Sequence, residues 1–440
     1  MLKTLFFLLK LFFLSVIVVW FFKNPGTVRI EWFETVHEIP VMVAVLGVLM
    51  ISIVFMLVLH VFLFFRKLPD IWRRFWEKQQ EKKGYQNFTE GFAALAMDDL
   101  ETAREKMIKT QTLLGESPLP LILAALAAQK ANDHVSAARV YGMLLKNKST
   151  EFLGYYGLTQ TAKSQRDYPA AYLYGKRAFE LSPSGKWVVI SLFELSLRLK
   201  DYTEAQYFLK KIKKYNAVKK DQLRHYEAVL SFLKGMDEPD QKSKIGYFQK
   251  SFESDPSFIP AVLAFTDAAI HLERPGKAEK LLKTSLKLSP HPDVAQAYVD
   301  LYEGISSGEK MKRAENVLLY SNANYVGHLI VIQTALKEGF TGIARTHLDL
   351  ALVSNEGSSP KLNFLTQQLK ELDGNIIPWS SKNTLEKIVS SKADKTWQCT
   401  SCLTTYPQWD FICRECDQAD AIFWKDPLNH KPSKYIISAH

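Results

Sequence analysis

The feature that most constrains the fold of this 440-residue chain is a pattern that returns every 34 residues. Four segments share a short polar turn followed by a helical stretch with a small residue near its start: DDLETAREKMIKT, NDHVSAARVYGMLLKNK, RDYPAAYLYGKRAFELSP and KDYTEAQYFLKKIKK. The small residues are Ala103, Ala137, Ala171 and Ala205. A period of this length predicts units of two antiparallel helices that stack into a solenoid.

A second recurring sequence motif extends the array. KRAFELSP ends at Pro183, QKSFESDP at Pro256 and KTSLKLSP at Pro290, and the last two prolines are again one period apart. Proline stops a helix because it cannot continue the hydrogen-bond ladder. The period is that of tetratricopeptide repeats, and we expect an all-α fold with a tetratricopeptide-type helical solenoid over residues 85–372, with looser units around Ala314 and Ala344. An irregular helical bundle is the alternative.

Two apolar runs precede the array. Residues 5–22 contain one charged residue, Lys10, and residues 39–65 contain none except His60. Each run approaches the length needed to cross a hydrocarbon core of roughly 30 Å. The sequence therefore predicts a transmembrane hairpin over residues 1–65, with a short loop at 23–38. A cleaved signal peptide is the alternative for the first run, but no small-residue cleavage site follows it.

Basic residues indicate the orientation. The loop carries two lysines or arginines, whereas seven follow the second run within residues 66–83. By the positive-inside rule, both termini face the cytoplasm. We expect residues 66–84 to form a basic juxtamembrane helix whose Trp72, Phe75 and Trp76 lie at the headgroups of anionic lipid. The net charge of +10 would also suit nucleic acid, but the adjacent span favours lipid.

The array contains no motif of a known catalytic site. It lacks a glycine-rich phosphate loop, H-E-x-x-H and G-x-S-x-G. Its histidines are scattered, and we expect surface or core positions for all of them: His134, His225, His271, His291, His328 and His347. We therefore predict no catalytic residue and no enzyme activity, and a partner-binding groove of the kind that solenoids present.

All four cysteines lie near the end of the chain, as C-x2-C-x10-C-x2-C. After a linker at 373–396, residues 397–427 are predicted to form a metal-binding module with four ligands, Cys399, Cys402, Cys413 and Cys416. Paired C-x2-C turns present thiolates tetrahedrally to one ion, and zinc is favoured over iron. Redox-active thiols are the alternative. The expected apolar shell consists of Trp397, Tyr406, Trp409, Phe411, Phe423 and Trp424.

Two stretches carry a resemblance to a known family. NPGTVRIEWFETVHEIPVMVAVLGVLM and GYQNFTEGFAALAMDDLETAREKM resemble the HemY N-terminal-domain proteins, which are bacterial inner-membrane tetratricopeptide proteins associated with haem biosynthesis. The resemblance implies a scaffold that organises late tetrapyrrole enzymes or intermediates at the inner membrane. Direct binding of haem or porphyrin remains open, and no dinucleotide-binding glycine motif supports an oxidase activity.

The C-terminal module resembles the rubredoxin-like module of the lipopolysaccharide assembly protein LapB. That similarity implies the alternative function, an adaptor that regulates envelope lipopolysaccharide assembly. The sequence departs from such modules at one point. Glycine usually follows the second cysteine of each pair, where a left-handed backbone is needed, and here those positions hold Leu403 and Asp417.

Overall fold

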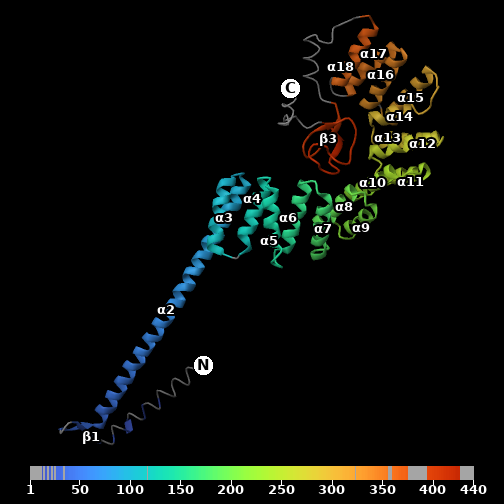
Figure 1. Ribbon diagram of the computed structural model, residues 1–440. Helices are drawn as coiled ribbons and strands as arrows, with labels where there is room; N and C mark the ends of the chain where they lie inside the picture. Colours follow the sequence, from blue (N-terminus) through green and yellow to red (C-terminus); the bar gives the residue numbers. More distant parts are fainter. Residues whose placement is uncertain are drawn as a thin grey trace. The chain divides into compact units, whose positions relative to one another are not determined.

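The computed structural model describes residues 26–32, 35–115, 117–322, 324–354, 359–374 and 394–426, with a few isolated residues before residue 26. The chain divides into two compact units, Met1–Asp133 and His134–His440, each shown in Figure 1. The first predicted membrane helix, residues 5–22, lies almost entirely outside the described residues. So does most of the linker at 373–396.

The first unit starts with a β-hairpin that the all-α expectation missed. Strands β1 (Thr27–Trp32) and β2 (Thr35–Pro40) pair antiparallel, with Thr27 opposite Pro40 and Trp32 opposite Thr35. Alternating side chains in TVRIEW and TVHEIP favour strands over helix. The Val41 amide, at the start of the next helix, donates to the Gly26 carbonyl at 2.9 Å and closes the hairpin onto that helix.

A single 56-residue helix, α2 (Val41–Ala96), follows the hairpin. Its segment Val41–Phe62 is long and apolar enough to cross a membrane, and none of it is buried inside the molecule. It is the one such span among the described residues. Trp72, Phe75 and Trp76 are exposed further along the same helix. The end of α2 packs on α3 (Leu100–Leu114) and α4 (Pro118–Lys130), around Ala94, Leu95, Ala103 and Leu123.

The second unit is an array of helix pairs (Figure 1). Its helices are α5 (His134–Leu144), α6 (Glu151–Ser164), α7 (Tyr168–Leu181), α8 (Lys186–Arg198), α9 (Tyr202–Lys214), α10 (Lys220–Asp237), α11 (Gln241–Ser254), α12 (Ile259–His271), α13 (Pro275–Leu288), α14 (Pro292–Val299), α15 (Ser307–Tyr320), α16 (Tyr325–Glu338), α17 (Thr341–Ser354) and α18 (Pro360–Leu372).

The repeated turns have a common local cause. Asp98, Asn132, Arg166 and Lys200 all adopt positive φ, between 56° and 66°, at the same position of four successive turns. The next residue is an aspartate each time, and three of these aspartates accept a hydrogen bond from the backbone N–H three residues on: Asp99, Asp167 and Asp201. A left-handed residue ends one helix, and a capping aspartate starts the next.

The small residues of the repeat are buried where helices meet. Ala103, Ala137, Ala171 and Ala205 are each 0% exposed, as are their later counterparts Ala178, Ser251, Ser285, Ala314 and Ala344. Only small side chains let neighbouring helix backbones approach this closely. The 34-residue pattern therefore identified core positions in the helical array, which confirms the predominantly helical repeat fold.

The C-terminal module is a three-stranded antiparallel sheet in the order β4-β3-β5. Strand β3 (Thr396–Cys399) lies in the centre, between β4 (Thr405–Tyr406) and β5 (Ile422–Lys425). The same buried apolar cluster contains helix residues from Ala178 onward and module residues such as Trp397 and Phe411. The module therefore shares one core with the array, and Figure 1 shows helices curving around it.

Candidate metal centre

The four cysteines lie on two backbone turns with the same hydrogen bonds. In the first, Leu403 N–H donates to the Cys399 carbonyl at 3.1 Å, and Cys399 N–H donates to the Thr404 carbonyl at 2.9 Å. In the second, Asp417 N–H donates to the Cys413 carbonyl at 2.8 Å. The Cys413 N–H in turn donates to the Gln418 carbonyl at 3.0 Å. Each turn thus directs its two sulfurs to the same side.

The sulfurs converge on one point. All four Sγ atoms lie within 4.8 Å of one another. The Cys399 and Cys416 sulfurs are 3.6 Å apart, and those of Cys402 and Cys413 are 3.5 Å apart. A tetrahedral ion with four thiolates at about 2.3 Å needs sulfur–sulfur distances of about 3.8 Å. A disulfide needs only about 2.05 Å, so this arrangement fits a shared ion and not an S–S bond.

The surroundings of the sulfurs favour thiolate at one position. Cys399 and Cys413 are both 0% exposed. Burial raises the pKa of the Cys413 thiol, but hydrogen bonds from Tyr406 Oη, at 3.0 Å, and from backbone N–H groups outweigh burial and lower its pKa to about 7. Burial raises the pKa of Cys399. Metal ions bind thiolates, and a cation among these sulfurs would offset the cost of deprotonating the others.

Both residues that follow the cysteine pairs adopt the left-handed backbone that glycine would supply. Leu403 has φ 63° and Asp417 has φ 58°. The turn hydrogen bonds are therefore formed without glycine at either position. For Leu403 this conformation is strained, because its Cβ approaches the following carbonyl. For Asp417 the strain is smaller, and its side chain has a further role.

Asp417 joins the module to the repeat array. Arg198, at the end of α8, donates from one guanidinium nitrogen to both carboxylate oxygens of Asp417, at 3.1 Å each. Its other nitrogen donates to the Asp417 carbonyl, and Tyr168 Oη donates to the carboxylate. The Arg198 side chain is only 4% exposed and lies 4.6 Å from the centre of the Tyr168 ring. An ion pair this buried is costly to break.

A second ionic contact lies on α10. His225 Nδ1 is 2.9 Å from Asp255 of the array, and its Nε2 is 3.1 Å from Asp420 of the module. Burial lowers the pKa of His225, but the two carboxylates outweigh burial and raise the pKa to about 9. The imidazolium at neutral pH therefore bridges two carboxylates, one from each side of the interface.

Aromatic contacts complete the interface. Trp409 packs edge-on against Phe232 and Phe258, with ring centres 5.4 and 5.1 Å apart. His291 lies 5.6 Å from the Trp397 ring and 4.2 Å from the Trp424 ring. Burial lowers the pKa of His291 to about 4, so it packs here as a neutral ring.

These contacts include functional residues that the sequence analysis did not single out. His225 and His291 were expected to be unremarkable array histidines, and both lie against the module. Phe258 and His291 are 33 residues apart and are the N-cap residues of α12 and α14, whereas His225 lies in the second turn of α10. The spacing is a sequence signal that relates Phe258 to His291. Elsewhere His328 and His347 form a pair, with their Nδ1 atoms 3.1 Å apart.

The fold and the site together define a class, a tetratricopeptide-type helical repeat protein closed by a four-cysteine module that could hold a structural metal. Residues 26–132 match the family model described as HemY protein N-terminus. The resemblance to the HemY N-terminal-domain family is therefore confirmed over that stretch, which includes the candidate membrane span and the first repeat helices. No curated protein matches the chain.

Solved structures of similar type share the helical repeat at low identity. A tetratricopeptide repeat protein from Parabacteroides merdae is 12% identical, with 66% of this chain and 99% of that chain covered and a TM-score of 0.35. YrrB, a TPR protein with an unusual peptide-binding site, is 17% identical. The match covers 43% of this chain and 95% of that chain, with a TM-score of 0.33. The fold class follows from the helix pairs of the chain itself.

Proposed function

We propose that the chain is a membrane-anchored tetratricopeptide scaffold associated with haem biosynthesis, which organises late-pathway enzymes or intermediates at a bacterial inner membrane. The observation that carries this proposal is the HemY N-terminus match over residues 26–132. The helical repeats support a binding role, because solenoids present extended surfaces to other proteins. The proposal assigns no catalytic residue and no enzyme activity to the chain.

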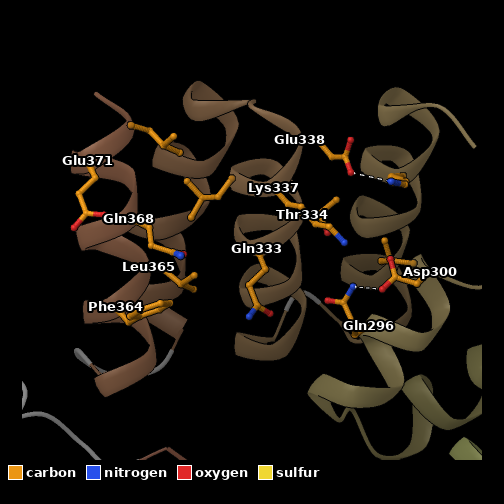
Figure 2. Close-up of a pocket in the computed structure, with 14 residues that line it drawn as sticks. Gln296, Asp300, Gln333, Thr334, Lys337, Glu338, Phe364, Leu365, Gln368 and Glu371 are labelled. Atoms are coloured by element: carbon orange, nitrogen blue, oxygen red, sulfur yellow. Dashed lines mark hydrogen bonds and ion pairs between the residues drawn. The ribbon is translucent and has the colours of Figure 1, made fainter. Parts of the chain in front are cut away.

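A hollow near the end of the array is the proposed partner site (Figure 2). It has a volume of about 840 Å³ and is lined mainly by the later turns of α14, α16 and α18. The module contacts the start of α14 at His291 instead. Asp394, two residues before β3, accepts a hydrogen bond at 2.9 Å from the hydroxyl of Tyr325, at the start of α16. The hollow is therefore open while the module is docked.

The lining of the hollow suits an extended peptide. Figure 2 shows Gln333 and Gln368 at its centre, and each amide offers a donor and an acceptor that match a peptide group. Phe364, 47% exposed, provides an apolar contact nearby. Lys310 and Glu338 pair with each other at 3.0 Å, so much of the charge is already neutralised.

The experiment is affinity purification from gently solubilised membranes, with bound proteins identified by mass spectrometry. The test variant is Gln333→Ala with Gln368→Ala, and the matched control is Gln222→Ala with Gln249→Ala, on other helices. Haem-pathway enzymes such as ferrochelatase should be recovered with the wild type and the control and lost from the test variant. Recovery of a membrane protease or a lipid-A enzyme instead would replace the proposal with the LapB-like adaptor.

The same proposal includes one structural metal ion, zinc in preference to iron, held by Cys399, Cys402, Cys413 and Cys416. The sulfur distances support these ligands, and four thiolates leave no open position for catalysis. The module has a small core of its own, and such an ion would stabilise it in addition to its contacts with the array. Haem or porphyrin binding is a separate possibility that a spectral titration of the purified protein would test.

We also propose a two-pass topology with both termini in the cytoplasm and with residues 66–83 on anionic lipid. Because all native cysteines lie in the proposed metal centre, a cysteine introduced elsewhere reports the side of the membrane on which it lies. In spheroplasts, a membrane-impermeant maleimide should label Arg29→Cys, in the loop, and should leave Lys83→Cys, beyond the span, unlabelled until lysis. Labelling of Lys83→Cys in intact spheroplasts would contradict the orientation.

A further inference from the structure

Helix α10 has two functional faces. His225 and Phe232, which contact the module, are seven residues apart and therefore lie on one side of the helix, since successive residues turn by about 100°. Glu227 and Lys234 are likewise seven apart, and they lie on the opposite side. That second face is not covered by the module.

On this second face α9, α10 and α11 enclose a small pocket with a volume of about 300 Å³. Its apolar lining includes Leu209, Leu230 and Tyr247. Four lysines from three helices also line the pocket: Lys210 and Lys213 of α9, Lys234 of α10 and Lys250 of α11.

The positive charge of the pocket is not balanced by the protein. Glu227 is the only carboxylate in the lining, and none of the four lysines makes an ion pair with another described residue. Lys234 donates a hydrogen bond to Gln206 at 3.2 Å. Burial lowers the pKa of Lys234, and repulsion from Lys250 lowers it further. Like charges held together at a partly buried site are stabilised when an anion binds between them.

We propose that this pocket binds a phosphate group. Lysine ammonium groups bind phosphate as compact point charges, and four of them surround this one pocket. The phosphate belongs either to a soluble phosphate ester or to a phospholipid headgroup. The site is independent of the hollow in Figure 2 and of the metal centre.

The test uses the full-length chain in lipid nanodiscs and follows the acylation rate of each lysine by mass spectrometry. One arm adds inorganic pyrophosphate to phosphatidylcholine nanodiscs, and the other replaces part of that lipid with phosphatidylglycerol. Lys234 and Lys250 should react about tenfold more slowly in at least one arm. Protection by pyrophosphate identifies a soluble ligand, and protection by phosphatidylglycerol alone identifies a headgroup.

A pair of variants on one helix provides the control. Lys210→Ala with Lys213→Ala should weaken the protection of Lys234 by about tenfold or more, because two charge-assisted hydrogen bonds are lost. Lys211→Ala with Lys214→Ala removes the same charge from α9, where these lysines lie over Tyr207 and Tyr215, and should leave the protection unchanged. No protection in either arm, or an equal loss in both variants, would overturn the proposal.

Discussion

Arg198 and Asp417 are 219 positions apart in sequence, yet the guanidinium of one donates to both carboxylate oxygens of the other at 3.1 Å. Asp417 follows the last cysteine of the metal centre, and its backbone forms the turn that positions Cys413. The contact that docks the module therefore comes from the same residue that shapes the metal site. Metal binding and docking on the array are expected to be coupled through it.

Replacement of Arg198 by alanine should release the module from the array. The loss leaves the Asp417 carboxylate partly buried without its cation, at a cost of about 3 kcal/mol. Hydrogen exchange of residues 396–425 should accelerate, whereas exchange in α12 and α13 should stay slow. The control is Arg177→Ala, which breaks an exposed pair with Glu180 and should cost less than about 0.5 kcal/mol. Equal exchange in both variants would contradict the docking role.

Replacement of Cys413 by serine should remove the metal and leave the array folded. A hydroxyl cannot substitute for a thiolate in a closed four-sulfur site. The measurement is zinc and iron content by elemental analysis, beside helical content by circular dichroism. Ser401→Ala, in the other turn, should keep one equivalent of metal. A full equivalent in the Cys413 variant would disprove the ligand assignment.

The ionic bridge at His225 predicts a loss of stability in alkali. Its pKa is raised from 6.5 to about 9, so its contribution is complete below pH 6.5 and disappears as pH rises through 9. The free energy of unfolding of the wild type should therefore exceed that of His225→Gln by about 2–3 kcal/mol at pH 6. The difference should shrink by pH 10.

The exposed His271 provides the comparison for this pH series. It pairs only with Asp267, one turn away on the same helix, at 3.6 Å. His271→Gln should follow the wild-type profile within about 0.5 kcal/mol at every pH. A pH-independent difference for the His225 variant would show that packing against Phe258 and Phe423, and not charge, accounts for its effect.

Replacement of Leu403 by glycine should stabilise the module. Leu403 has φ 63°, and relief of a left-handed conformation is worth about 1 kcal/mol, less some lost side-chain contact. The measurement is competition for zinc with a chelator, in which the variant should retain the ion at higher chelator concentration. Asp417→Gly relieves a similar φ but removes the carboxylate that pairs with Arg198, so it should lose zinc more readily.

Much of the array and the ligand set follow from local sequence. Ala103, Ala137, Ala171 and Ala205 recur every 34 residues because each must fit the same crowded helix contact, and the structure buries all four completely. Each pair of cysteines is placed by one short turn, and turn geometry acts over only a few residues. Periodicity and cysteine spacing are local properties, so the repeat and the candidate ligands can be read from the sequence, whereas the meeting of the two turns is a tertiary contact.

The position of the module on the array depends on long-range contacts. Its partners Arg198, His225, Phe258 and His291 are distant from the cysteines in sequence, and no local pattern identifies them as contacts of the module. The pocket of four lysines likewise exists only because three helices bring them together. Leu403 takes its left-handed backbone against its own preference. The physical reason is that long-range packing and charge pairing, which depend on how distant segments meet, outweigh local preference at these sites.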